Sequence, residues 1–168
     1  MTFSNLINKI YDAFNQHLPG FEAHLELAPY RQKVEQNLKK NNPKIASTLL
    51  LLYPSESDIY FCLIERTEYE GTHSKQISFP GGRNENGETI KETALRECNE
   101  EIGVPIDEIN IIGELTQVYV PPSNYLIHPF VGYCDFKPSF KPDEREVKTI
   151  IEIKINELFK PGLIKKQK

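Results

Sequence analysis

The stretch that decides the fold of this chain is residues 77–104, which read ISFPGGRNENGETIKETALRECNEEIGV. Within it, Thr89 to Ile102 is predicted to form a helix. Thr89 followed three residues later by Glu92 has the form of a capping box, in which each residue bonds the backbone N–H of the other. Gly103 is the residue type that commonly ends a helix, and the proline two positions later cannot continue one. We therefore expect a helix with defined ends.

One face of this predicted helix carries three carboxylates, because Glu97, Glu100 and Glu101 stand at positions i, i+3 and i+4. Like charges at this spacing repel one another by roughly a few tenths of a kcal/mol per exposed pair, and a bound cation removes that cost. Carboxylate oxygens with no histidine or cysteine among them suit a hard ion, so the expected cofactor is Mg²⁺ or Mn²⁺. The alternative is a solvated acidic face that binds nothing.

The residues before the helix favour the metal site. A strand-like run begins at Ile77 and ends in two glycines, Gly81 and Gly82. Glycines let the backbone turn sharply and come close to a ligand, where a carbonyl oxygen can complete a metal site. We therefore predict that a carbonyl near these glycines, assigned to Gly82, joins the three glutamates as a metal ligand.

This spacing also resembles the signature of the Nudix hydrolases, which cleave diphosphates linked to another moiety, usually a nucleoside. The resemblance consists of Gly82, then Glu88 after five residues, then the run from Arg96 to Val104 after seven more. It implies an α/β (α+β) fold of the Nudix type, an α/β/α sandwich with a mixed β-sheet flanked by helices. It also implies a metal-dependent hydrolase of nucleoside diphosphate derivatives, and it gives Gly81, Glu88 and Gly103 structural roles in the motif.

The segment upstream of the motif resembles the coenzyme A pyrophosphatase subgroup of that family. The matching residues are Arg66, His73, Gln76, Phe79 and Pro80, and residues 123–130 and 146–147 also look like the subgroup. This implies coenzyme A or its derivatives as substrate, with products 3′,5′-ADP and phosphopantetheine, and substrate contacts from Arg66, His73, Gln76 and Phe79. Three of these residues also have plain alternatives: Arg66 as a surface charge, His73 as a surface histidine and Phe79 as strand-end packing.

Two departures from the subgroup bear on the substrate. Gly71 stands where the subgroup has a basic residue, and Lys75 stands where it has glycine. We expect Lys75 to take over the contact with the 3′-phosphate of coenzyme A. The alternative substrates are ADP-ribose and nucleoside triphosphates, and the alternative from another class is a Nudix-like module that binds a nucleotide without cutting it.

The chemistry assigns roles to the motif residues. Hydrolysis of a diphosphate needs charge neutralisation on the phosphoryl oxygens and an aligned, deprotonated water. Arg96 is expected to orient the carboxylates through ion pairs, and Glu88 to stabilise the corner between loop and helix. The general base is Glu100 or Glu146, with a slight preference for the helix; for Glu146 the alternative is a solvated charge.

Composition limits the remaining possibilities. The chain has 168 residues, 39% of them hydrophobic, which suits one domain with one proper core. Its net charge of −4 argues against a nucleic-acid partner, since such binders usually carry a basic face. No apolar run is long enough to cross a membrane, and polar residues interrupt the apolar N-terminal stretch, so we predict no membrane segment and no secretory signal. The cysteines are few, odd in number and widely spaced, which predicts buried free thiols and a cytoplasmic location: Cys62, Cys98 and Cys134.

The predicted organisation has three parts. Residues 1–44 hold an N-terminal amphipathic helix, running from Phe3 to Leu18, and a connecting segment with at most a short helix. The stripe on the first helix is expected to pack on the domain, with a homodimer contact as the alternative. Residues 45–160 form the Nudix domain and residues 161–168 a basic tail. Within the domain we expect strands at 46–53, 59–65, 110–120, 126–136 and 147–153, and a short helix at 155–159.

Overall fold

The computed structural model describes residues 2–28, 42–68 and 76–163. Its α-helices are α1 (Phe3–Phe14), α2 (Gly20–Leu27) and α4 (Ile90–Ile102), and its short 3₁₀ helices are η1 (Ile106–Glu108) and η2 (Ile155–Phe159). The strands are β1 (Lys44–Ser55), β2 (Asp58–Arg66), β3 (Ile77–Ser78), β4 (Gly81–Arg83), β5 (Asn110–Glu114), β6 (Val118–Val120), β7 (Tyr125–Tyr133) and β8 (Val147–Lys154).

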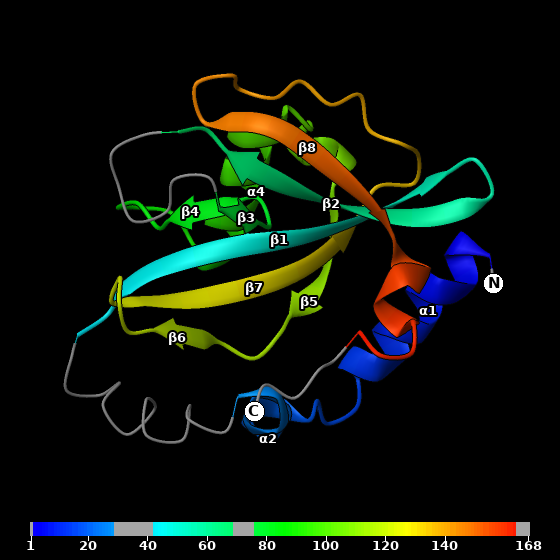
Figure 1. Cartoon of the computed structure of the whole chain (residues 1–168), viewed down its shortest axis with the longest axis horizontal. Helices are drawn as coiled ribbons and strands as arrows, with labels where there is room; N and C mark the ends of the chain where they lie inside the picture. Colours follow the sequence, from blue (N-terminus) through cyan, green and yellow to red (C-terminus); the bar gives the residue numbers. More distant parts are fainter. Residues whose placement is uncertain (1, 29–41, 69–75, 164–168) are drawn as a thin grey trace.

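The strands form one mixed sheet around β1, as predicted (Figure 1). The order along the sheet is β3-β2-β1-β7-β5, and β4, β6 and β8 pair with β1, β7 and β2 respectively. The central pair of β1 and β7 runs parallel, whereas β2 and β4 both run antiparallel to β1. β2 pairs with the end of β1 and β4 with its beginning, and Gly81 at the start of β4 bonds Glu101 near the end of α4.

Hydrophobic cores lie on both faces of the sheet, which makes the fold an α/β/α sandwich. Along β1, Leu49, Leu51 and Tyr53 face the core that includes α4, whereas Leu52 faces a second core with α1. This alternation follows from the two-residue period of a strand and explains why 49–52 is continuously apolar. All three cysteines are free and buried, as predicted, and Cys98 packs α4 onto the sheet.

The predicted central helix is confirmed with its caps. The Thr89 hydroxyl accepts a hydrogen bond from the backbone N–H of Glu92 at 3.2 Å, and the Glu92 carboxylate accepts one from the backbone N–H of Thr89 at 2.7 Å. At the other end, Gly103 has φ +71°, in the left-handed region where glycine carries no steric cost.

Some predicted boundaries were wrong. The expected strand over 110–120 is divided into β5 and β6, because the partner strand β7 contains Pro129, which has no N–H to donate to a continuous ladder. The first helix ends at Phe14 rather than Leu18, and the short helix α2 begins at Gly20. The strand expected over 126–136 ends at Tyr133.

Within the part of the chain that the structure describes, no helix is long and apolar enough to span a bilayer. The cytoplasmic location stays a prediction.

Candidate active site

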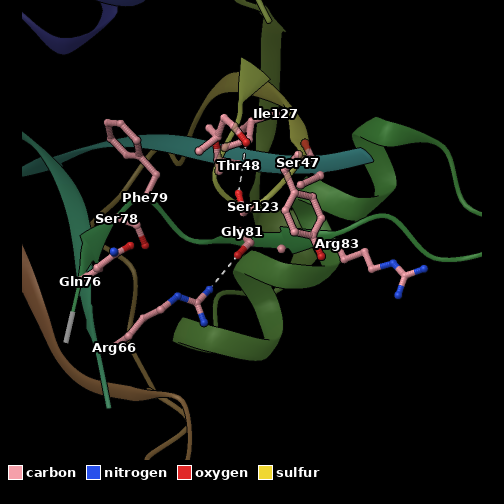
Figure 2. A pocket seen from close by; sticks show the side chains of 14 residues that line it. Ser47, Thr48, Arg66, Gln76, Ser78, Phe79, Gly81, Arg83, Ser123 and Ile127 are labelled. Carbon is pink, nitrogen blue, oxygen red and sulfur yellow. Dashed lines mark hydrogen bonds between the residues drawn. The ribbon is translucent and has the colours of Figure 1, made fainter. Parts of the chain in front are cut away.

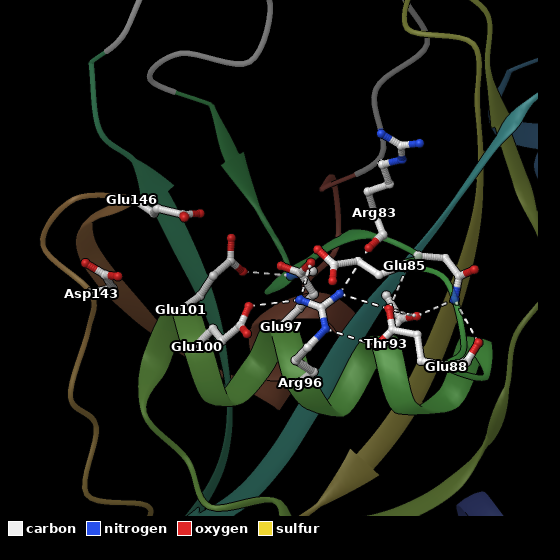
Figure 3. Close-up of polar contacts among 12 residues, drawn as sticks. Arg83, Glu85, Glu88, Thr93, Arg96, Glu97, Glu100, Glu101, Asp143 and Glu146 are labelled. Carbon is white, nitrogen blue, oxygen red and sulfur yellow. Dashed lines mark hydrogen bonds and ion pairs between the residues drawn. The ribbon is translucent and has the colours of Figure 1, made fainter.

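Arg96 lies at the centre of the acidic cluster on α4 (Figure 3). Its Nη1 donates to Glu97 and to Glu100, at 2.9 Å in both cases. Its Nε and Nη2 donate to the two carboxylate oxygens of Glu88 at 3.0 Å each, and Nη2 also donates to the carbonyl oxygen of Arg83 at 3.1 Å. All the N–H groups of this guanidinium are therefore engaged within the protein. The predicted orienting role of Arg96 agrees with this geometry.

Glu88 anchors the corner between the loop and α4. Besides Arg96, it accepts hydrogen bonds from the backbone N–H of Glu85 at 2.8 Å and from the hydroxyl of Thr93 at 2.9 Å. The hydrogen bonds from Arg96, above all, lower the pKa of the Glu88 carboxyl to about 2. Glu88 is therefore charged at any pH of interest, and its contacts agree with the predicted role at the corner between loop and helix.

Glu101 differs from the other carboxylates because it is buried, with 1% of its side chain exposed. One carboxylate oxygen accepts from Nη2 of Arg66 at 2.7 Å, and the other accepts from the backbone N–H of Gly81 at 2.7 Å. Burial raises the pKa of Glu101 to about 7, although Arg66 and the Gly81 N–H act in the opposite direction. Glu101 thus joins α4, β2 and β4 at one point.

Glu97 lies directly against Gly82. A Cβ atom placed on Gly82 would meet the carboxylate carbon of Glu97 at 2.4 Å, so only glycine allows this approach. Burial raises the pKa of Glu97, and the ion pair with Arg96 opposes this. The predicted proximity of the second glycine to the carboxylate helix is therefore present in the fold.

Glu100 and Glu146 are the open carboxylates of this region, each with 58% of its side chain exposed. Glu146 precedes β8, and its carboxylate lies 4.0 Å from Nη1 of Arg66. Figure 3 shows the Glu146 side chain turned toward Glu101. The fold therefore brings the two candidates for the general base to the same region, one from α4 and one from the loop before β8.

The donor set fits a hard divalent cation. Its side chains are all carboxylates, they come from α4 and the edge of β8, and the Gly81 and Gly82 carbonyls lie on the adjoining strand. Arg96 and Arg66 already stabilise this negative charge from two sides. Among residues 2–28, 42–68 and 76–163, no three metal-ligating side chains converge on one point, because Glu97 and Glu100 are turned to Arg96.

A pocket of about 380 Å³ adjoins the carboxylates (Figure 2). One wall follows the chain from Gln76 to Arg83, and the other is formed by β1 and by the apolar residues Val120, Tyr125 and Ile127. Arg66 lies at the boundary between pocket and acidic cluster, since it lines the pocket and also donates to the Gly81 carbonyl at 3.0 Å.

The predicted substrate residues have different positions. Arg66, Gln76 and Phe79 line the pocket, and Phe79 also packs on Phe61 in the second core, so packing and pocket lining coexist. His73 and Lys75 lie outside the described residues. His128, in the segment 123–130, is buried, and its Nδ1 lies 2.6 Å from a carboxylate oxygen of Glu114.

Sequence reasoning missed two features of this site. The burial of Glu101 could not be predicted from the neighbouring sequence, because Glu100 beside it is also a glutamate and is exposed. The pocket wall at Tyr125 and Ile127 could have been found, because residues 123–130 belong to the segment that resembles the subgroup.

Comparison with known proteins agrees with this geometry. Residues 43–168 match the family model of the NUDIX domain. The chain is 38% identical to Nudix hydrolase 3 of Caenorhabditis elegans over 109 residues, which is 62% of this chain and 45% of that protein. It is 35% identical to the uncharacterized Nudix hydrolase NudL of Pectobacterium atrosepticum over 92 residues, 52% of this chain and 45% of that protein. The chain thus spans less than half the length of these relatives.

Solved structures share the fold. A C. elegans Ap4A hydrolase in a binary complex superposes with a TM-score of 0.57 at 15% identity, covering 69% of this chain and 83% of that one. The NUDIX domain of Shewanella oneidensis NrtR, complexed with ADP ribose, superposes with a TM-score of 0.55 at 12% identity, covering 70% and 76%. At these identities the similarity extends to the fold alone, which is the mixed sheet with flanking helices described above.

Proposed function

Because this chain belongs to the Nudix family, we propose that it is a metal-dependent hydrolase that cleaves the diphosphate bond of a nucleoside diphosphate derivative. One observation carries the proposal. The α4 carboxylates lie next to an open pocket, and Arg66 and the two glycines of β4 connect the two. A pure binding module has no need of several mutually repelling carboxylates at the end of its pocket.

The side chains of α4 would hold the cofactor. Members of the family generally use divalent metal ions, and we propose Mg²⁺ or Mn²⁺, held by Glu97, Glu100, Glu101 and a carbonyl at Gly82. When bound, such an ion polarises phosphoryl oxygens and lowers the pKa of a water molecule. Arg96, saturated by its own bonds, keeps Glu97 and Glu100 together and makes no substrate contact.

Arg66 and an open carboxylate would complete the reaction centre. Arg66 pairs with Glu101 and presents its guanidinium to the pocket, where its planar fork suits phosphoryl oxygens. The water's proton goes to Glu100 or Glu146, both of which are exposed and near the cluster. We place the base on the helix, at Glu100.

For the substrate we propose coenzyme A or its derivatives, giving 3′,5′-ADP and phosphopantetheine. Support comes from the upstream segment, of which Arg66, Gln76 and Phe79 line the pocket, with His73 as a further contact proposed from the sequence. Arg83 also lines the pocket, and its positive charge suits the 3′-phosphate, in the role that the sequence assigns to Lys75.

A hydrolysis assay with Mg²⁺ tests this function. Purified protein is given coenzyme A, dephospho-coenzyme A, ADP-ribose, Ap4A and nucleoside triphosphates, with and without chelator. We expect chelator to stop hydrolysis, coenzyme A to be the best substrate, and Glu101→Gln to fold normally while losing several orders of magnitude in rate. A preference for ADP-ribose would reject the coenzyme A assignment, and near-normal turnover by Glu101→Gln would reject the metal site.

A further inference from the structure

Ser78 carries a buried hydroxyl oxygen for which the structure offers no hydrogen-bond partner. Among the described residues, the Ser78 hydroxyl oxygen is the buried side-chain polar atom that lacks a hydrogen-bond partner. A buried hydroxyl without a partner costs about 1–3 kcal/mol, so native proteins rarely keep one unless it bonds something absent from the free molecule.

The position of Ser78 indicates where that partner comes from. Ser78 lines the pocket and is itself only partly buried, between Gln76 and Phe79 on one wall (Figure 2). In the sheet it lies directly opposite Ile64 of β2, so the two side chains share the face that carries α4 and the carboxylates. Since no hydrogen bond holds its hydroxyl, rotation about χ1 toward the pocket breaks none.

The chemistry of this wall indicates what kind of group approaches Ser78. Arg66 is adjacent, since its backbone N–H donates to the carbonyl of Gln76 at 3.0 Å and its guanidinium lines the same pocket. The apolar residues of the pocket, Tyr125 and Ile127 among them, come from the other wall. The anionic part of a ligand is therefore stabilised on the side of Ser78, and its uncharged organic part on the side of Tyr125.

We propose that the Ser78 hydroxyl is a substrate-binding group that donates a hydrogen bond to a non-bridging oxygen of the diphosphate. This inference rests on the proposed function, in that it takes the pocket to hold a diphosphate ester, and it names one further residue that recognises the diphosphate. The hydroxyl gains its bond only when the ligand is present, so its contribution goes to binding and none of it to the stability of the free protein.

The test measures stability and binding on the same variant, Ser78→Ala. Removing an unpartnered buried hydroxyl should leave the thermal midpoint of the free protein unchanged or raise it. By contrast, Ser47→Ala should lower the thermal midpoint, because the Ser47 hydroxyl donates a hydrogen bond to the His128 carbonyl at 2.9 Å. Binding is measured by calorimetry in the presence of Mg²⁺ with two ligands. One is α,β-methylene-ADP, an analogue whose methylene bridge cannot be hydrolysed, and the other is adenosine. We expect Ser78→Ala to weaken binding of the analogue about tenfold or more and to leave adenosine binding unchanged.

Several results would overturn the inference: equal affinity of wild type and Ser78→Ala for the analogue, an equal loss for adenosine, or a lowered thermal midpoint of Ser78→Ala. The failure of the proposed function has a different signature. If the wild type hydrolyses none of the diphosphates but binds the analogue in a Ser78-dependent way, the function fails and the contact stands. If hydrolysis proceeds and Ser78→Ala has wild-type kcat/KM, the function stands and the contact fails.

Discussion

Replacing Gly82 with alanine should lower the proposed hydrolase activity about 100-fold without unfolding the protein. The new Cβ would lie 2.4 Å from the Cδ and Oε1 atoms of Glu97, whereas ordinary contact begins at 3.4 Å, so the carboxylate must move by about 1 Å. The obstructing group is the end of a flexible side chain, and the backbone of Gly82 is not in the left-handed region, so the fold can accommodate the methyl group. A misplacement of about 1 Å in a reaction centre costs on the order of 100-fold in rate, or about 2.7 kcal/mol.

The assay compares kcat/KM, Mg²⁺ dependence and thermal unfolding of Gly82→Ala and wild type. We expect kcat/KM to fall about 100-fold. The free energy of unfolding should change by less than about 1 kcal/mol, which corresponds to a midpoint shift of no more than a few degrees. A Glu97→Asp background supplies the control: the shorter side chain no longer reaches the methyl group, so Gly82→Ala should cost less there. Full activity of Gly82→Ala, or equal losses in both backgrounds, would refute the reasoning.

Two further predictions concern carboxylates near the cluster. The pKa of Glu101 is raised to about 7 in the metal-free protein, so its contribution to stability is present below about pH 4.5 and lost as the pH rises through 7. In chelator, the unfolding free energy of wild type relative to Glu101→Gln should therefore fall by up to about 3 kcal/mol over this window, and a flat difference in denaturant titrations would contradict the burial argument. If Glu146 is the general base, Glu146→Gln should lower kcat by about 10²–10⁴-fold with little change in KM. Our expectation is that Glu100→Gln shows this loss instead, and steady-state kinetics of the two variants with pH profiles decide between them.

Several local features that the sequence predicts are present in the structure. The capping box at Thr89, the glycine at the helix end and the alternation along β1 are local patterns, and each is present where the sequence predicts it. Strand ends were less predictable. The break between β5 and β6 depends on Pro129 in the partner strand β7. Because Pro129 lies outside residues 110–120, the sequence of that segment cannot predict the break.

By itself, the sequence determined which residues share one face of α4, because helical spacing places Glu97, Glu100 and Glu101 together whatever the rest of the chain does. Only the tertiary structure decided how these three differ. Glu101 is buried because β2 and β4 pack over it and supply Arg66 and the Gly81 N–H, whereas Glu100 is left open. The same packing leaves the Ser78 hydroxyl without a partner beside the pocket. Burial and pairing arise between segments far apart in the chain, and they set the pKa and the accessibility of a side chain, which spacing alone cannot.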